Sequence, residues 1–471
     1  MNELNNQKSI SQQSVPTGAG VGTSRRRFIG SVGSAASGAF AMQFLTHPVF
    51  GQDAPGNKLR LAGIGIGGMG NGNLRQCEKE EIVALCDVDS NYAAGVFKRY
   101  PDARRYRDYR ELFAKEEDLD GVVIATPDHT HAVITMEALR QGAHVFCQKP
   151  LTHTVVEART VTEFARKSGL QTQMGNQGHS SEGIRLLKEW VADGAIGNIT
   201  EVHAWTDRPV GGNPWSDFPI QERPKDTPPV PDGLDWDLWL GPVEERPYHP
   251  IYHPKTWRGW VDFGTGSLGD MGCHILDPAF YALELGSPVM VEGTSSHFEP
   301  ALMREAFPRA SMVRFRFAAR KGMPPVTLHW YDGRLKPLRP AILKSDPKLP
   351  ASGAMLVGDE GVIVHGSHGA GGLRILPDEK MAAYKRRLPE KTIPRVKGGH
   401  EGDWLRACKD GRPASATFDY GGPLTELVLL GMAALRRPNQ QLEWDTAGLR
   451  FSNNDEANQL LHSSYRKGWS L

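Results

Sequence analysis

A glycine-rich turn early in the chain restricts the fold more than any other feature of the sequence. In NKLRLAGIGIGGMGNG, a short apolar run at 59–64 leads directly into Gly65-x-Gly67-x-x-Gly70. A strand that enters such a turn ahead of a helix is typical of a βαβ unit that binds a dinucleotide. Gly65 permits a tight turn, Gly67 lets the backbone approach a pyrophosphate, and Gly70 lets helix and strand pack closely.

The residues that follow the turn support this interpretation. A helix is expected from Asn73 onward, and then EIVALCDVD predicts a second strand that ends at Asp87. A carboxylate there can bind the ribose hydroxyls of NAD and repel the extra phosphate of NADP, and the helix N-terminus can bind the phosphates. We therefore expect NAD, with NADP possible, to contact these residues: Gly65, Gly67, Gly68, Met69, Gly70 and Asp87. The alternative is a glycine turn in a cofactor-free βαβ unit, since the chain has 52 glycines.

Strand and helix patterns keep alternating as far as residue 177. Strands are expected at 122–125, in AHVFCQKP and in LQTQMGNQ, with helices at 132–142 and 155–167 between them. Such alternation predicts a doubly wound parallel sheet with helices on both faces, a Rossmann domain at 58–175. Ligands of these sheets bind beyond the carboxyl ends of the strands.

Lys149 stands at one of these strand ends. Pro150 cannot extend the strand ladder and favours an extended conformation for the residue before it. The strand AHVFCQKP should therefore deliver the Lys149 amine to the cofactor crevice. The alternative is a solvated charge at the end of a strand, because lysine is seldom buried.

After residue 175 the pattern changes, and 176–471 is predicted to be an α+β domain with a mostly antiparallel open sheet. Strand-like runs occur at 198–209, 310–319 and 324–334. Residues 208–260 are rich in Pro, Trp and His and contain no periodic element, and this segment is longer than an ordinary connection between elements. Segments of this kind often cover an active site or form an oligomer contact.

The segment GTGSLGDMGCHILDPAFYALEL contains a second group of candidate catalytic residues. Asp270 and His274 are four residues apart, so a helix would place them on one face, with Asp277 one turn further on. A carboxylate beside an imidazole can hold a hydroxyl and accept its proton. Pro278 is expected to weaken the helix near His274. The alternative is a capping aspartate together with a buried structural histidine.

Composition and charge exclude several other classes of function. Lys and Arg number 55 against 54 Asp and Glu, so no positive field attracts nucleic acid or an anionic membrane. Beyond the first fifty residues no apolar run reaches the length of a membrane span. The five cysteines lack C-x-x-C spacing, which argues against a zinc site or disulfide framework. His249, His253 and Arg258 lie among prolines, so substrate contact or packing is expected there rather than a metal.

Residues 1–57 are predicted to be an export signal and a disordered linker. Residues 1–23 have little to bury, and SRRRFIG precedes a mildly apolar stretch to Leu45. Paired arginines ahead of Phe28 and Ile29 indicate the twin-arginine route to the periplasm. That route carries folded proteins, which suits a cofactor bound tightly in the cytoplasm. A chance basic patch is the alternative.

Taken together, these motifs resemble the glucose-fructose oxidoreductase and inositol dehydrogenase family, written Gfo/Idh/MocA, and more narrowly its exported bacterial branch. The resemblance covers about residue 58 to the end and rests on these segments: the glycine turn, CDVD, ATPDHTHA, the K-P dipeptide, GSLGDMGCHILD and NNDEANQLLHSSYRKGWSL. It implies hydride transfer between NAD or NADP and a sugar, polyol or sugar derivative. It also implies a homo-oligomer formed through the open sheet.

The resemblance assigns roles to particular residues. Lys149 would hold and polarise the substrate hydroxyl, Asp270 would position it, and His274 would be the general base. Gln148 stands where the family has a glutamate before the lysine. The remaining residues implied to contact cofactor or substrate are Thr126, Pro127, His129, His131, Asn176 and Arg258.

Two other functions remain open on the sequence alone. One is an exported glycoside hydrolase that keeps its NAD and works by oxidation, elimination, hydration and reduction, which suits a compartment poor in free cofactor. The other is a cofactor-binding sensor or scaffold without turnover, which Lys149, Asp270 and His274 together make less attractive.

Overall fold

The computed structural model describes residues 58–209, 222–296, 304–345 and 348–471. The chain divides into two units, 1–52 and 53–471, and every described residue belongs to the second. The segment with the paired arginines therefore lies outside the described residues. No helix of the described residues is long and apolar enough to cross a membrane.

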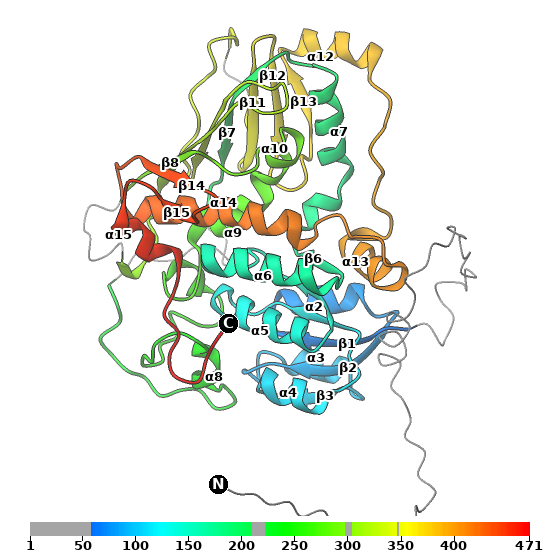
Figure 1. Ribbon diagram of the computed structural model, residues 1–471, viewed down its shortest axis with the longest axis vertical. Helices are drawn as coiled ribbons and strands as arrows, with labels where there is room; N and C mark the ends of the chain where they lie inside the picture. The colour runs from blue at the N-terminus through cyan, green and yellow to red at the C-terminus, as the bar shows by residue number, and fades with distance from the viewer. Residues whose placement is uncertain (1–57, 210–221, 297–303, 346–347) are drawn as a thin grey trace, which may run out of the picture. The chain divides into compact units, whose positions relative to one another are not determined.

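The first sheet confirms the predicted Rossmann-like domain. Its six strands are all parallel and run in the order β3-β2-β1-β4-β5-β6. Figure 1 shows β1, β2 and β3 of this sheet next to the helices α3 (Ala94–Arg99) and α4 (Tyr109–Lys115). The strand order reverses between β1 and β4, and this switch point is where sheets of this kind bind ligands. The strands are β1 (Arg60–Ile64), β2 (Glu81–Cys86), β3 (Arg104–Tyr106), β4 (Gly121–Ile124), β5 (His144–Cys147) and β6 (Thr172–Met174).

Two helices of this domain begin earlier than the sequence pattern predicted. α2 (Met69–Gln76) starts within the glycine turn rather than at Asn73, and α5 (Asp128–Arg140) starts directly after Pro127. The first turns of both helices contain glycine or buried polar residues, whose weak helix propensity gave no sequence signal. Tertiary packing makes these residues helical all the same. α6 (Val155–Ser168) matches its prediction: Thr154 and Glu157 form a capping box. The two remaining helices are α3 (Ala94–Arg99) and α4 (Tyr109–Lys115).

The second sheet has nine strands among the described residues, in the order β13-β12-β11-β7-β10-β9-β8-β14-β15. β7 and β10 are parallel, whereas the other neighbouring strands are antiparallel, which confirms a mostly antiparallel sheet. The strands are β7 (Ile199–Trp205), β8 (Met290–Ser295), β9 (Ser311–Phe317), β10 (Val326–Tyr331), β11 (Gly353–Gly358), β12 (Val362–Gly366), β13 (Arg374–Leu376), β14 (Leu442–Asp445) and β15 (Arg450–Phe451).

Helices connect the two sheets into one core. The apolar helix α14 (Phe418–Arg436) packs on α6 and on β8, and the main hydrophobic cluster continues from one sheet to the other. α13 (Gly399–Asp410) lies late in the sequence, yet its Trp404 packs against Phe146 of β5. The other helices are α7 (Glu182–Ala192), α8 (Trp236–Leu240), α9 (Gly266–Ile275), α10 (Asp277–Ala282), α12 (Asp378–Tyr384) and α15 (Asp455–Asn458), with 3-10 turns η2 (Gln177–Ser180), η3 (Thr256–Gly259), η4 (Lys385–Arg387) and η5 (Gln459–Leu461).

Candidate active site

A cavity of about 470 Å³ lies at the carboxyl ends of β1, β2, β4 and β5. The second domain contributes the facing wall through α9, η3 and the ends of two strands. Nine of the residues predicted to bind the cofactor line it: Gly65, Gly67, Gly68, Met69, Asp87, Thr126, Pro127, His131 and Lys149. The predicted substrate and catalytic residues Arg258, Asp270 and His274 line the same cavity.

The glycine turn has the geometry that its sequence predicts. Gly65 has φ of +76°, and a Cβ there would lie 2.6 Å from the backbone nitrogen of Thr126. A Cβ on Gly70 would lie 2.3 Å from the carbonyl oxygen of Gly65, so helix and strand pack as closely as expected. Gly67 instead faces the ring of Tyr92, which also lines the cavity. No side chain caps the N-terminus of α2.

Asp87 lies at the end of β2, as predicted. Its two carboxylate oxygens accept hydrogen bonds from the backbone N–H groups of Gly67 (2.9 Å) and Asp89 (3.0 Å). Burial raises the pKa of Asp87 to about 6, although these backbone bonds act in the opposite direction. The Asp89 carboxylate caps the following turn and contacts His253 at 2.8 Å. Of these two carboxylates, Asp87 is the one that lines the cavity.

Lys149 meets Asp270 directly across the cavity. Its Nζ donates to the Asp270 carbonyl oxygen at 2.7 Å and to Oδ1 at 2.9 Å. Two arginines contact the same carboxylate: Arg208 donates to Oδ2 at 2.5 Å, and Nε of Arg258 lies 3.4 Å from Oδ1. Burial by itself raises the pKa of Asp270, but the three cations outweigh it and hold that pKa well below its usual range.

His274 lies one turn after Asp270 on α9, and both residues line the cavity, as their spacing predicts. Burial, reinforced by the positive charge of Lys149, lowers the pKa of His274 well below its ordinary value. Its Nδ1 is buried and has no hydrogen-bond partner among the described residues. The ring of His368 lies 4.2 Å from that of His274, centroid to centroid. His274 is therefore a neutral imidazole with a free nitrogen.

Two neighbouring residues lie outside the cavity wall, unlike Asp270 and His274. α9 ends at Ile275 and Pro278 lies in the first turn of α10, so Asp277 does not continue the face of Asp270 and His274. Asp277 instead accepts hydrogen bonds from His179 at 2.8 Å and from Asn176 at 3.2 Å. The Asn176 side chain is fully buried in this contact and is not part of the cavity wall.

The two histidines of ATPDHTHA have different surroundings. His131 lines the cavity with both ring nitrogens 2.8 Å from carbonyl oxygens, of Pro150 and Thr126. Burial lowers its pKa, but Cys147, Asp128 and the Pro150 carbonyl outweigh burial and raise it to about 9. His129 lies between the carbonyl oxygens of Phe263 and Trp239.

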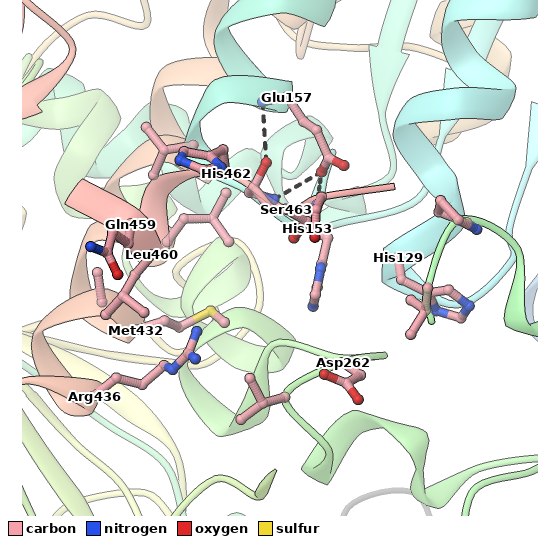
Figure 2. A pocket seen from close by; sticks show the side chains of 18 of the residues that line it. His129, His153, Glu157, Asp262, Met432, Arg436, Gln459, Leu460, His462 and Ser463 are labelled. Atoms are coloured by element: carbon pink, nitrogen blue, oxygen red, sulfur yellow. Dashed lines mark hydrogen bonds between the residues drawn. The ribbon is translucent and has the colours of Figure 1, made fainter. Parts of the chain in front are cut away.

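His129 borders a second cavity of about 300 Å³ rather than the first (Figure 2). Its ring packs on Trp239 and Phe263, 5.2 and 5.3 Å between centroids. His129 therefore packs α5 against Trp239 and Phe263, and the expectation that it contacts the cofactor is not supported by its position.

The aromatic segment, defined as residues 222–263, forms part of the cavity wall. It contains α8 and η3 but otherwise no regular element, in keeping with its sequence. Most of its large side chains pack into one cluster: Leu234, Trp236, Trp239, Leu240, Tyr248, Tyr252, Trp257, Trp260 and Phe263. It contributes Trp239, His253, Trp257 and Arg258 to the wall of the first cavity, so it covers part of this site.

Sequence reasoning missed several residues of the cavity, among them Tyr92, Arg208, His368 and Trp469. Arg208 follows β7, Tyr92 follows β2, His368 lies between β12 and β13, and Trp469 comes from the C-terminal segment. Of these four, Arg208 and Tyr92 had a usable signal, because Arg208 lies near the end of the strand-like run 198–209 and Tyr92 follows the strand predicted to end at Asp87. Among 58–209, 222–296, 304–345 and 348–471, no cluster of three or more His, Cys, Asp or Glu side chains could hold a metal ion.

Sequence comparison places this architecture in a known family. A family model for Gfo/Idh/MocA oxidoreductases, described as an NAD-binding Rossmann fold, matches residues 59–176, and the model for the family's C-terminal α/β domain matches 182–304. Inositol 2-dehydrogenase of Salmonella paratyphi B is 31% identical over 151 residues, 31% of this chain and 45% of that protein. The enzyme of the same name from Burkholderia multivorans is 27% identical over 241 residues, 50% and 66% of the two chains.

The match to the Salmonella enzyme thus spans about half of that relative's length. Among solved structures, the aldose-aldose oxidoreductase from Caulobacter crescentus, complexed with glycerol, is similar with a TM-score of 0.53. It is 17% identical, and the similarity covers 82% of this chain and all of that one, which shows a shared fold. On these matches and on its two sheets, the chain belongs to the Gfo/Idh/MocA oxidoreductase family, whose first domain is an NAD-binding Rossmann fold.

Proposed function

We propose that this chain is an NAD-dependent oxidoreductase that removes a hydride from a hydroxyl-bearing carbon of a sugar, polyol or sugar derivative. One observation carries the proposal: a single cavity extends from the glycine turn to Lys149, Asp270 and His274. A nucleotide on the turn and a hydroxyl beside the lysine would therefore share one enclosed space.

The residues present fit a dinucleotide. The uncapped N-terminus of α2 offers N–H groups to phosphates, and Gly67 and Gly68 keep that approach free of side chains. Asp87 would bind the ribose hydroxyls, with Thr126 and Pro127 along the length of the cofactor. NAD bound in this way supplies the acceptor for a hydride.

The chain's own residues would manage the hydroxyl and its proton. Lys149 donates a hydrogen bond to the substrate oxygen and stabilises the negative charge that develops there. Asp270 keeps the lysine ammonium in place through the contact at 2.9 Å. His274, neutral and with an unoccupied Nδ1, accepts the hydroxyl proton.

Turnover of a substrate panel with NAD+ tests the proposal. We expect NADH to accumulate in proportion to the oxidised sugar or polyol, and mass spectrometry of the native protein to detect bound nucleotide. Cleavage of a glycoside without net NADH would point to the redox-neutral hydrolase instead. The related proteins carry the names of dehydrogenases and oxidoreductases, which favours the first function. A protein that binds no nucleotide would contradict both.

The pH dependence of the reaction tests the role of His274. Because its pKa is lowered well below 6.5, the imidazole stays unprotonated, and thus able to act as a base, on the acid side of neutrality. We expect log(kcat/KM) to stay level as the pH falls through 6.5, where an ordinary histidine base would lose half of its activity. The measurement is a pH–rate profile, with His274→Gln as the variant that should lose the base. An acidic limb centred near 6.5 would contradict this assignment.

Tight cofactor binding, export and assembly remain proposals of the same kind. The support for export is the sequence of residues 24–29, and retention of Arg25→Lys/Arg26→Lys protein in the cytoplasmic fraction would test it. A homo-oligomer rests on the family resemblance, and sedimentation of the purified protein would test it.

A further inference from the structure

Three cations surround a single carboxylate in the cavity. Lys149, Arg208 and Arg258 all contact Asp270, at 2.9, 2.5 and 3.4 Å. Their side chains are only 12%, 22% and 22% exposed, and that of Asp270 is 6% exposed. This group, the Asp270 cluster, has three positive charges and one negative charge in a largely desolvated place.

Neighbouring groups offset this excess only in part. Asp128 is the next carboxylate of the wall, and it accepts a hydrogen bond from the Thr265 hydroxyl at 2.5 Å. Burial raises the pKa of Asp128, and the charges of Arg258 and Lys149 act against that rise, but Asp128 forms no ion pair with either of them among the described residues. Within the part of the chain that the structure describes, Asp270 is the one carboxylate in an ion pair with Arg208 or Arg258. His274 and His368 contribute no negative charge, because both are imidazoles.

The two arginines are also held in a way that suits a ligand. Arg258 stacks on the ring of Trp257 at 4.1 Å and donates to the carbonyl oxygen of Lys255 at 3.2 Å. Arg208 emerges at the end of β7 and reaches Asp270 with one nitrogen, NH1. Among the described residues, both guanidinium groups therefore keep donors for a further partner. A planar guanidinium binds carboxylate or phosphate oxygens in pairs.

Holding one hydroxyl requires only the lysine, the carboxylate and the base. Desolvating the charges of Arg208 and Arg258 without a neutralising anion costs free energy. We therefore expect an anion to bind beside these two arginines. We propose that the substrate carries an anionic group, as a sugar acid does, and that Arg208 and Arg258 bind it while Lys149 and His274 face the reacting hydroxyl. This inference rests on the proposed function and names the substrate class of the same site. A sugar phosphate shares this chemistry.

Matched substrates test the inference directly. The test compares each neutral sugar with its anionic derivatives: glucose with glucuronate and glucose 6-phosphate, and galactose with galacturonate. Two quantities are measured, kcat/KM with NAD+ and calorimetric binding to the NADH-loaded protein. We expect at least one anionic partner to exceed its neutral sugar by about tenfold or more, the effect of one charged hydrogen bond. Comparing glucuronate with glucose 6-phosphate shows whether the site prefers a carboxylate or a phosphate group.

The outcomes separate this inference from the proposed function. Neutral sugars oxidised as well as, or better than, their anionic partners would overturn the inference and leave the oxidoreductase intact. No NADH from any substrate would count against the proposed function, while calorimetry still decides the inference. If the NADH-loaded protein binds neither anionic sugar more tightly than its neutral partner, the calorimetry also overturns the inference.

Arginine variants provide a second test. Arg208→Gln and Arg258→Gln should each lower the anionic-to-neutral ratio of kcat/KM by about tenfold. Arg436→Gln is the control, because it removes a guanidinium from the second cavity, where Figure 2 shows Arg436 and Met432. This control should keep the ratio of the unaltered protein. An equal loss for both kinds of sugar in the Arg208 and Arg258 variants would mean that the arginines only hold Asp270, against the inference.

Discussion

Replacing Lys149 by methionine is expected to lower kcat/KM by roughly 10³-fold, within the range of a lost acid–base or polarising group. The substitution removes the ammonium that faces the substrate but keeps most of the side chain's apolar length. Asp270 retains Arg208 and Arg258 as partners, so its charge stays compensated and the fold should persist. Steady-state kinetics and the Kd for NAD+ measure the effect, and the Kd should change little.

Lys409→Met is the matched control for this variant. Lys409 contacts the buried carboxylate of Glu80 at 2.6 Å and is 14% exposed, close to the 12% of Lys149. It lies on α13, away from the cavity wall. The control therefore also removes a lysine from a buried pair, and it should keep its turnover. Similar losses in both variants would show that Lys149 acts through stability rather than chemistry.

Gly70→Ala is expected to raise the Kd for NAD+ by a factor on the order of 10 to 100, with a loss of about 1–3 kcal/mol in the free energy of unfolding. The added Cβ would lie 2.3 Å from the carbonyl oxygen of Gly65, which is backbone and cannot rotate away. α2 must then move off the turn, and its N-terminus loses the position that suits the phosphates. Calorimetric titration and chemical denaturation measure the two effects.

Gly95→Ala separates the collision from the general effect of adding alanine. Gly95 is also helical, in α3, and a Cβ there meets nothing within 4 Å. Alanine favours a helix over glycine by up to about 1 kcal/mol, so this variant should be as stable as the parent or more so. If Gly70→Ala behaved like Gly95→Ala, close packing of the turn would not be what positions α2.

The parts of the site that sequence predicted correctly lie within single elements. The turn at Gly65 and Gly70 follows from backbone sterics over six residues, and Lys149 follows from the end of one strand. Asp270 and His274 share a face because a helix repeats every 3.6 residues. The same reasoning failed at Asp277, where Pro278 starts a new helix. Asn176 was a candidate through the family resemblance alone, and its buried amide donates to Asp277.

Residues that reach the site from other elements could not be predicted in this way. Arg208 is 62 positions before Asp270, and His368 packs against His274 from the connection between β12 and β13 of the second sheet. Trp469 reaches the cavity from the end of the chain. No spacing rule links such positions, since their contact depends on how the sheet and helices pack.

The sequence by itself determined that strands and helices alternate around the glycine turn, where that turn lies, and which lysine, carboxylate and imidazole are candidates for chemistry. These follow from local periodicity and backbone sterics. Only the tertiary structure decided that three cations meet on Asp270, that His274 is neutral, and that His129 and Asn176 lie outside the cavity. Charge balance and burial are properties of groups distant in the chain, so they arise only when the two sheets pack together.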